Sequence, residues 1–442
     1  MTGLLTDLYQ LTMAAGYYES GKTGEIAIFE LFFRHLPRYR NFVLSAGLAQ
    51  AVDYLQNLHF EETEVRYLRS LPHFAHAPEG FFELLSGLRF TGDLFAMPEG
   101  TPIFAGEPFL TVRAPLIEAQ LVETYLLAII GFESLIATKA ARIAEVAAGR
   151  GVVDFGTRRA HSPEAGVLAG RASYIGGCVG TSNTETGFRY GVPVFGTAAH
   201  SWVQSFRSER EAYERLQKLL GAATVYLIDT YDTIEGARLA STLGRPLWGV
   251  RLDSGNIVEL AHEVRRILDQ AGLTDAKIMA TSDLNEYKIL EFAAAQAPID
   301  AFGVGTDLAT SADSPNLGVV YKLVELDGRQ TAKFSEDKHT MPGSKQIFRF
   351  ANHDVIACNW ECVGCEPGEP SAKALLRPVL LQGRLVEPLP DATEARQYAL
   401  KSIQKLPLAT RSLFDTEQKY RVEYSQELMS LYDRVQRARL DS

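Results

Sequence analysis

The chain is poor in cysteine and has no long uncharged apolar segment. Four cysteines among 442 residues cannot make a disulfide scaffold. A membrane-spanning helix needs about 18 or more apolar residues in a row. The nearest run here, Leu121 to Ile130, contains Glu123. The N-terminal stretch from Met1 to Gln10 carries Asp7 and no basic group, so the sequence predicts neither a signal peptide nor a spanning helix.

An excess of positive charge is also lacking. Lys and Arg total 44 against 54 Asp and Glu, and the formal charge of −10 argues against a general nucleic-acid binder. The 36 glycines and 19 prolines are ordinary numbers, which excludes collagen-like repeats and wholesale disorder. Apolar residues make up 46% and charged residues 22%. A chain of this length should form two or three packed units, and its composition is typical of a cytoplasmic enzyme.

The common phosphate-binding signatures are missing or out of context. The sequence has no GxGxxG after its first strand-like run. Residues 16–23 match GxxxxGK[ST], but they precede the strand-like run at 25–34, whereas a P-loop follows a strand and leads into a helix. Solenoid-type repeats and low-complexity segments are absent as well. The missing GxGxxG and the position of the GxxxxGK[ST] match before a strand disfavour the doubly wound folds that bind dinucleotides or use a P-loop.

What is present in the first third is a mixture of strands and helices. A dense apolar run over 25–34 predicts a strand, and an apolar stripe over 47–58 predicts a helix. Closely spaced Pro and Gly over 90–112 predict a small β unit. Pro115 and Gly131 bracket one helix, and a second runs from Leu135 to Gly149. We place an N-terminal α/β domain at 1–131, an α/β barrel at 132–330 and a C-terminal segment at 331–442.

The middle of the chain alternates strands with helices, which predicts a parallel α/β sheet, either closed as a barrel or doubly wound. The strands are predicted at Val152–Phe155, Val192–Phe195, Val225–Ile228, Leu247–Leu252, Lys277–Ala280 and Ile299–Phe302. The clearest helix covers Ile257 to Gln270 and stops before Gly272. Beyond about residue 330 the alternation ends; Asp391 and Glu394 predict a capped helix, and a last helix begins near Ser425.

Polar residues or glycines follow each predicted strand directly. In α/β barrels the active site forms at this carboxyl-end edge, here termed the rim. The rim candidates are Arg158, Arg159 and Arg251 as donors to phosphate or carboxylate, Asp229, Asp253 and Asp283 for Mg²⁺ or ribose hydroxyls, Gly303 and Gly305 for backbone contact with phosphate, and His200. The pattern predicts a phosphorylated sugar as substrate, a metal ion, and a further group that requires an arginine.

Each of these features also has a structural explanation. Asp253 and Ser254 are plausible N-caps for the helix at Ile257, and Ser282 with Asp283 could cap the next one. An isolated histidine such as His200 is more often structural than catalytic. Glycines mark turns everywhere, so Gly303 and Gly305 alone carry little weight. The joint pattern at six strand ends favours the functional interpretation.

Five motifs resemble the nicotinate phosphoribosyltransferase family. They are Asp154-Phe155-Gly156-Thr157-Arg158-Arg159-Ala160, Gly196-Thr197-Ala198-Ala199-His200-Ser201, Arg251-Leu252-Asp253-Ser254-Gly255-Asn256, the N-terminal Leu5-Thr6-Asp7-Leu8-Tyr9-Gln10-Leu11-Thr12-Met13 and the late Pro342-Gly343-Ser344-Lys345-Gln346. The resemblance implies an irregular α/β barrel and an N-terminal α/β domain completed by the C-terminal segment. It implies a homodimer with shared active sites. The reaction would convert nicotinate and phosphoribosyl pyrophosphate to nicotinate mononucleotide and pyrophosphate, with Mg²⁺ and with ATP hydrolysed through a phosphohistidine.

The resemblance also implies roles for individual residues. His200 matches the phosphorylated histidine, Asp253 the carboxylate that orients it, and Arg251 a contact to the ribose phosphate. Phe155 and Arg158 match the groups around the pyridine ring and its carboxylate. The other implied substrate-binding residues are Ser201, Asp229, Ser282, Asp283, Gly303, Gly305 and Thr306, with Tyr9 and Arg34 from the partner subunit. Lys345 and Arg349 resemble a basic motif near pyrophosphate.

One motif and several alternatives lie outside this scheme. Cys358, Cys362 and Cys365, with His353 upstream, could hold a zinc ion or be free thiols. A nicotinamide-specific relative would use the same chemistry on a neutral substrate, and quinolinate phosphoribosyltransferase shares the fold. A catalytically dead barrel that binds nucleotides is disfavoured by the intact His200, Arg251 and Asp253. A nucleic-acid adaptor built on the cysteine loop is disfavoured by the acidic charge balance.

Overall fold

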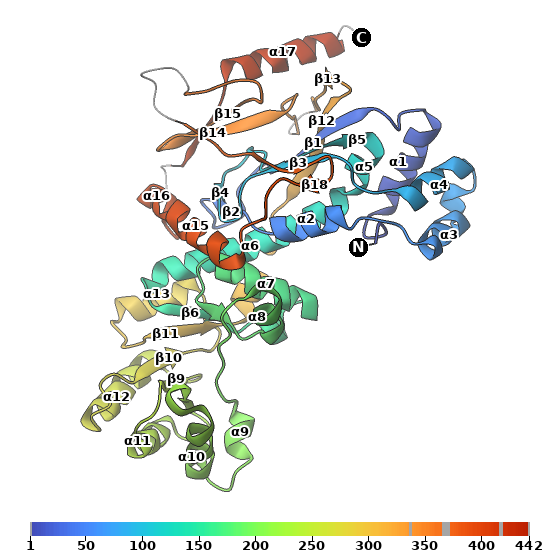
Figure 1. Ribbon diagram of the computed structural model, residues 1–442. Helices are drawn as coiled ribbons and strands as arrows, with labels where there is room; N and C mark the ends of the chain where they lie inside the picture. The colour runs from blue at the N-terminus through green and yellow to red at the C-terminus, as the bar shows by residue number, and fades with distance from the viewer. Residues whose placement is uncertain (1, 336–337, 365–371, 415–418, 441–442) are drawn as a thin grey trace. The chain divides into compact units, whose positions relative to one another are not determined.

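The structure is a computed structural model that describes residues 2–335, 338–364, 372–414 and 419–440. It divides into two compact units (Figure 1). The first comprises Met1–Leu135, Asn316–Pro390 and Tyr398–Ser442, and the second comprises Ile136–Pro315 and Asp391–Gln397. The first unit is therefore built from both ends of the chain, which confirms that the C-terminal segment completes the N-terminal α/β domain.

The first unit is organised around a seven-stranded sheet in the order β13-β12-β1-β5-β3-β17-β18. Its strands are β1 (Ile26–Phe33), β3 (Asp93–Ala96), β5 (Leu110–Pro115), β12 (Val319–Leu326), β13 (Arg329–Gln330), β17 (Arg377–Leu381) and β18 (Arg384–Leu385). The apolar run predicted as a strand is β1, which pairs antiparallel with β5 on one side and with β12 on the other. Leu31 and Phe33 are fully buried there, so the densest apolar strand lies in the middle of the core.

Smaller elements surround this sheet. A four-stranded sheet, β16-β14-β15-β19, contains β14 (Lys345–Arg349), β15 (His353–Cys358), β16 (Lys373–Ala374) and β19 (Arg421–Tyr424), and β2 (Val43–Leu44) pairs with β4 (Pro102–Ile103). The helices are α1 (Leu8–Glu19), α2 (Leu48–Gln56), α3 (Glu62–Ser70), α4 (Glu79–Gly87), α5 (Leu116–Leu121), α16 (Leu408–Arg411) and α17 (Gln426–Leu440). Two helices contribute residues to both units, α6 (Glu123–Ala147) and α15 (Ala392–Gln404). Asp391 and Glu394 form the predicted reciprocal capping bonds at the start of α15.

The second unit is the predicted parallel α/β sheet. Its six strands are β6 (Gly151–Asp154), β7 (Gly180–Thr181), β8 (Val225–Leu227), β9 (Gly249–Leu252), β10 (Lys277–Ala280) and β11 (Ala301–Val304). They pair in the order β7-β6-β11-β10-β9-β8, which is the chain order of a barrel interrupted only between β7 and β8. The helices between them are α7 (Pro163–Ile175), α8 (Thr184–Tyr190), α9 (His200–Gln204), α10 (Glu209–Leu220), α11 (Thr233–Leu243), α12 (Ile257–Gln270), α13 (Glu286–Ala294) and α14 (Thr306–Thr310).

Two predicted elements differ from the structure. The segment Val192–Phe195 forms only an isolated parallel bridge, from Val194 to Thr181, while the short strand β7 was not predicted. Helix α6 continues through Gly131 instead of ending there. A mid-helix glycine costs only about 1 kcal/mol, and the apolar stripe continues across it with Ile130 and Leu135 buried. A Cβ at position 131 would lie 3.3 Å from Val319, so close packing explains the glycine.

Candidate active site at the rim of the parallel sheet

Strand register and alternation place the central candidates on one face of the sheet. Arg251 lies opposite Met279 in the β9–β10 pair, and Val304 lies opposite Asp154 in the β11–β6 pair, so these strands end at the same edge. Side chains alternate between faces along a strand. The face opposite the helix-covered core carries Val153, Met279 and Ala301. Residues two positions further along each strand lie on the same face, and these are Phe155, Thr281 and Gly303. Arg251 of β9 and Asp253, which follows that strand, lie on this face as well.

Arg251 is the centre of the polar cluster. Its guanidinium donates to the Asp253 carboxylate at 2.7 Å, to Thr281 Oγ1 at 3.0 Å and to Thr197 Oγ1 at 2.8 Å. The side chain is 12% exposed. These contacts hold a forked cation at the rim, where it can bind a phosphate or carboxylate.

Asp253 links the arginine to the histidine. Burial alone would raise the pKa of Asp253, but the hydrogen bond from Thr281 and the charge of Arg251 outweigh burial, so the pKa is lowered. The Nε2 atom of His200 lies 3.6 Å from Asp253 Oδ2, and its Nδ1 atom lies 3.2 Å from Thr230 Oγ1. His200 is the first residue of α9, and its side chain is 41% exposed. The structure thus brings together His200, Asp253 and Arg251, the three residues predicted to be catalytic.

Asp229 binds the loop that carries Asp253, and one of its carboxylate oxygens accepts no hydrogen bond. Its Oδ2 accepts hydrogen bonds from the Asp253 backbone N–H at 3.0 Å and from the Ser254 hydroxyl at 2.6 Å. Its Oδ1 is buried without a hydrogen-bond partner. Mg²⁺ is usually bound by one or two carboxylates together with substrate phosphates. An unsatisfied carboxylate oxygen beside Asp253 fits that requirement, so the residues present are compatible with Mg²⁺.

Phe155 supplies a flat apolar surface beside the polar cluster. It is half-buried and packs against the small cluster of Val153, Met279 and Ala301. The Arg251 guanidinium lies 5.9 Å from its ring centroid. A Cβ on Gly303 would lie 2.4 Å from the Phe155 ring, so only glycine leaves room for the ring in this position.

The capping explanation of the two aspartates is wrong. The N-cap of α12 is Asn256, which accepts from the backbone of Glu259, and the N-cap of α13 is Asn285. Because the asparagines cap the two helices, the Asp253 carboxylate is available to pair with Arg251, and Asp283 is exposed at the rim. Ser282 and Asp283 both have left-handed backbone conformations, with φ of 84° and 44°. Such strain in consecutive non-glycine residues is typical of functional loops.

The remaining rim candidates have few contacts. Arg158 lies in a short 3-10 helix, Thr157–Arg159, and is exposed, with no hydrogen bond or ion pair to any residue that the structure describes. Ser201 and Thr306 are exposed, and Gly305 immediately precedes α14. These positions are open to a ligand, but the structure does not join them to the Arg251 cluster.

The hydroxyl groups that organise the rim were not assigned a role from the sequence. Thr197, Thr230 and Thr281 bind Arg251 or His200, and each lies within three residues of a predicted site residue. The buried Asp154 was not assigned a role either; it accepts from Thr181 Oγ1 at 2.7 Å and from the Gly156 backbone at 2.8 Å. Desolvation raises the pKa of Asp154. Its position at the end of β6 was the available signal.

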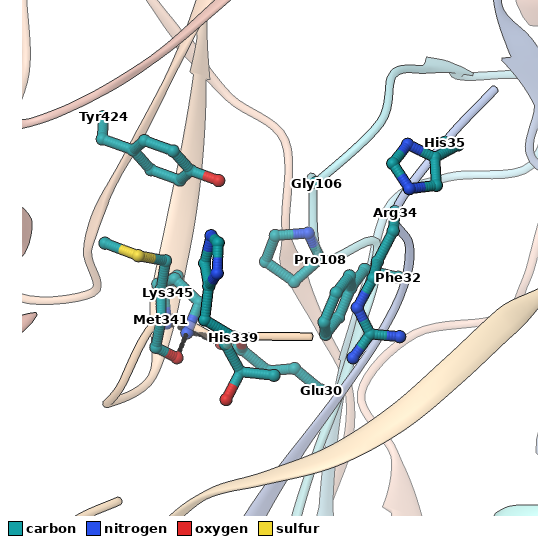
Figure 2. Close-up of a pocket in the computed structure, with 11 residues that line it drawn as sticks. Glu30, Phe32, Arg34, His35, Gly106, Pro108, His339, Met341, Lys345 and Tyr424 are labelled. Carbon is teal, nitrogen blue, oxygen red and sulfur yellow. Dashed lines mark hydrogen bonds and ion pairs between the residues drawn. The ribbon is translucent and has the colours of Figure 1, made fainter. Parts of the chain in front are cut away.

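Four predicted residues belong to the first unit. Tyr9 lies on α1 and is 50% exposed. Arg34 follows β1 and lines a cavity of about 200 Å³ together with Lys345 (Figure 2). Lys345 is buried and forms an ion pair with Glu30 at 2.7 Å, and Arg349 pairs with Asp354 at 2.5 Å. The charges of Lys345 and Arg349 are therefore already balanced within this unit.

The cysteine motif does not assemble a metal centre in the part of the chain that the structure describes. Cys358 is a buried free thiol at the end of β15, whereas Cys362 is disulfide-bonded. His353 begins β15, and its ring stacks on Phe350. In its disulfide, Cys362 is neither a free thiol nor a zinc ligand. Cys365 lies outside the described residues, so zinc binding by the reduced motif stays a prediction.

The chain matches one protein family along almost its whole length. Residues 4–131 match the nicotinate phosphoribosyltransferase N-terminal domain, residues 151–355 the nicotinate phosphoribosyltransferase family, and residues 344–432 the nicotinate phosphoribosyltransferase C-terminal domain. Nicotinate phosphoribosyltransferase pncB2 of Mycobacterium tuberculosis is 44% identical over 98% of this chain and 94% of its own length. The human nicotinate phosphoribosyltransferase is 33% identical, over 97% of this chain and 95% of its own.

Solved structures agree with the sequence matches. The crystal structure of human nicotinic acid phosphoribosyltransferase superimposes with a TM-score of 0.86 at 31% identity, covering 97% of this chain and 99% of that chain. Nicotinate-nucleotide pyrophosphorylase of Pyrococcus furiosus gives a TM-score of 0.76 at 26% identity, covering 91% and 95%. The fold and the rim therefore define a phosphoribosyltransferase of the irregular α/β-barrel class. Within that class, the chain belongs to the nicotinate phosphoribosyltransferase family.

Proposed function

We propose that this protein transfers the phosphoribosyl group of phosphoribosyl pyrophosphate to nicotinate, forming nicotinate mononucleotide and pyrophosphate in NAD salvage. The observation that carries the proposal is the Arg251–Asp253–His200 cluster at the rim, beside the aromatic surface of Phe155. Relatives across bacteria and mammals bear the name of this activity.

The transfer is mainly a problem of charge. As pyrophosphate leaves, the ribose carbon C1 becomes oxocarbenium-like, and the nicotinate nitrogen must be held in line behind it. Arg251 would neutralise phosphate oxygens, while Asp229 and Asp253 would hold Mg²⁺. When bound, Mg²⁺ would neutralise the charge of the departing pyrophosphate. Ser282, Asp283, Gly303, Gly305 and Thr306 would bind the ribose and its phosphate at the ends of β10 and β11.

Nicotinate needs a flat partner for its ring and a cation for its carboxylate. Phe155 is the proposed ring contact, and the exposed Arg158 the proposed carboxylate ligand. By resemblance to the family, Tyr9 and Arg34 would reach this site from the partner subunit of a homodimer, and Ser201 would bind substrate beside the histidine. The exposure of Tyr9 supports such a role, because a tyrosine on a monomer surface is available to a second subunit.

ATP would act through His200. One imidazole nitrogen attacks the γ-phosphorus of ATP, the bond to the β-phosphate oxygen breaks, and ADP leaves. Water later cleaves the phosphohistidine and releases phosphate. Asp253 lies 3.6 Å from the ring and can stabilise the positive charge that develops on it. Phosphorylation places negative charge at the rim and can reorganise it for transfer.

We propose a cytoplasmic location, in keeping with the cysteine-poor composition of the chain. Among the helices that the structure describes, none combines the length and the hydropathy of a membrane span. The formal charge of −10 supports small-molecule substrates over nucleic acid.

A product assay tests the proposal. The protein is incubated with phosphoribosyl pyrophosphate, Mg²⁺ and either nicotinate, nicotinamide or quinolinate, with and without ATP. We expect nicotinate mononucleotide, formed faster with ATP and with ADP released in step. Turnover of nicotinamide alone would assign the protein to the sister activity, and no product from any acceptor would leave a nucleotide-binding barrel without catalysis.

A further inference from the structure

The loop between β10 and α13 is held in a conformation that it would not adopt alone. Ser282 and Asp283 have φ values of 84° and 44°, in the left-handed region that L-amino acids disfavour. Two such residues in succession persist only when the surrounding structure fixes both ends of the loop. One end is β10, whose register with β9 is set by parallel pairing. The other end is the start of α13.

Asn285 fixes this second end and connects it to the neighbouring loop. Its Oδ1 atom accepts from the backbone N–H groups of Tyr287 and Lys288, both at 3.1 Å, and so caps α13. Its side-chain amide donates to Asp307 Oδ2 at 2.8 Å. Asp307 is the second residue of α14 and follows Gly305 by two positions. One hydrogen bond therefore joins the loop that carries Asp283 to the loop that carries Gly305.

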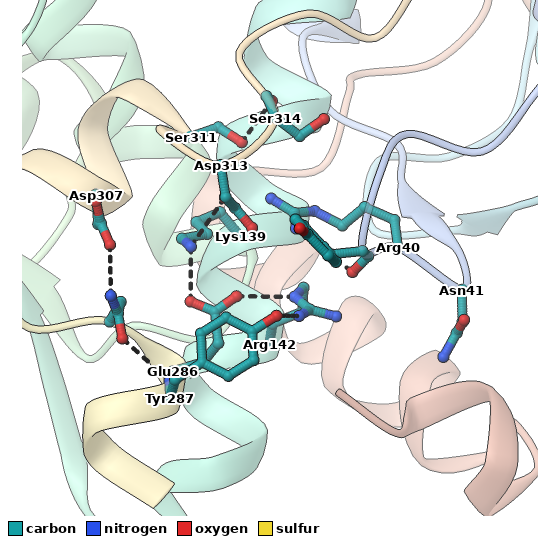
Figure 3. A network of polar contacts seen from close by, with 12 residues as sticks. Arg40, Asn41, Lys139, Arg142, Glu286, Tyr287, Asp307, Ser311, Asp313 and Ser314 are labelled. Carbon is teal, nitrogen blue, oxygen red and sulfur yellow. Dashed lines mark hydrogen bonds and ion pairs between the residues drawn. The ribbon is translucent and has the colours of Figure 1, made fainter. Parts of the chain in front are cut away.

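The segments that follow these loops, the start of α13 and the turn after α14, are also anchored to one helix, α6. Glu286, the first residue of α13, is fully buried and pairs with Lys139 at 2.6 Å and with Arg142 at 2.9 Å (Figure 3). Lys139 of α6 is 1% exposed and also pairs with Asp313, three residues beyond α14, at 2.9 Å. Buried, mutually paired charges of this kind make a stiff support, because moving one residue leaves an uncompensated charge.

We infer that Asn285 and Asp307 are positioning residues that set the spacing between the Asp283 and Gly305 loops. This inference rests on the proposed function, in which the two loops bind opposite parts of one phosphoribosyl group. Neither residue needs to touch the substrate. Their hydrogen bond fixes two contact surfaces at the separation that a ribose phosphate requires. The pair should therefore govern the KM for phosphoribosyl pyrophosphate and leave the KM for nicotinate nearly unchanged.

An exchange of the two side chains separates positioning from simple capping. Asp caps helices as well as Asn does, so Asn285→Asp keeps the cap of α13 but places two carboxylates face to face. We expect roughly a tenfold rise in the KM for phosphoribosyl pyrophosphate, equivalent to about 1.4 kcal/mol. The double variant Asn285→Asp/Asp307→Asn reverses donor and acceptor, and the KM should return to within about threefold of wild type. Asp307→Asn alone keeps an acceptor oxygen opposite Asn285. Its KM for phosphoribosyl pyrophosphate should therefore lie between those of Asn285→Asp and the double variant.

Hydrogen exchange of the peptide covering 281–285 gives a readout that does not depend on turnover. Its amides should exchange faster in Asn285→Asp and recover in the double variant. If the double variant fails to recover both the KM and the exchange rate, or if Asn285→Asp changes neither, the inference is wrong. Failure of the proposed function is distinguishable, because wild type would then form no nicotinate mononucleotide, and the exchange comparison would still decide the positioning claim.

Discussion

The two units contain similar pairs of charged residues in opposite settings. In the first, Lys345 and Glu30 are 5% and 0% exposed and form a closed ion pair beside the cavity of Figure 2. In the second, Arg251 and Asp253 are 12% and 27% exposed and lie beside a half-exposed histidine. Burial raises the pKa of Glu30, whereas the pKa of Asp253 is lowered. Charges that are buried and balanced support a fold, while charges that are partly open and oriented can bind an anion.

Replacing the central arginine should break this comparison most strongly. Arg251→Lys keeps one positive charge but loses the fork that contacts Asp253, Thr281 and Thr197. We expect kcat/KM to fall by about 1,000-fold, or about 4 kcal/mol. Steady-state kinetics measure the loss, and urea unfolding should show a change below about 1 kcal/mol. A variant that retains more than a tenth of the activity would remove Arg251 from the site.

The matching change in the first unit should affect folding instead. Lys345→Met leaves the Glu30 carboxylate buried without its partner, and we expect the free energy of unfolding to fall by about 3 kcal/mol. Urea denaturation measures this. Adding Glu30→Gln removes the unpaired charge and should recover at least half of the loss. Wild-type stability in the single variant would show that this pair is not structural.

Much of this contrast could be predicted from the sequence, but not all of it. Alternation of strands and helices identified β9, β10 and β11, and the polar residues at the end of β9 identified Arg251 and Asp253. His200 was identified after the predicted strand Val192–Phe195, which forms only an isolated bridge. The local pattern could not assign caps, because Asp, Ser and Asn are all good N-caps and only the structure shows Asn256 and Asn285 in that role. It could not tell that Lys345 is neutralised by Glu30, a residue more than 300 positions away.

A smaller perturbation sharpens the account of the aromatic surface. Gly303→Ala would place a methyl group 2.4 Å from Phe155, so the ring must shift. We expect the KM for nicotinate to rise about tenfold, or about 1.4 kcal/mol. Gly87→Ala at the end of α4 is the control, because no atom lies within 4 Å of its added methyl. An unchanged KM would place nicotinate away from Phe155.

The smallest expected effect concerns pH and the first unit. Burial and the neighbouring Asp354 raise the pKa of Glu107 well above its ordinary value. A carboxyl with a raised folded-state pKa stabilises the fold below the unfolded-state pKa, and this contribution is lost as pH rises through the folded-state value. In Glu107→Gln the free energy of unfolding should fall less steeply as pH rises, by at most about 1.4 kcal/mol per pH unit. Urea unfolding from pH 5 to pH 9 measures it; parallel curves for the two proteins would contradict the assignment.

The most direct test of the rim is a count of ADP released against nicotinate mononucleotide formed, in wild type and in His200→Asn. The account predicts that wild type releases ADP in step with product. The variant should still transfer phosphoribose, more slowly and without ATP consumption, because in the proposed mechanism His200 couples ATP hydrolysis to transfer and does not itself form the new bond. ADP released in step with product by His200→Asn would contradict the role of this cluster.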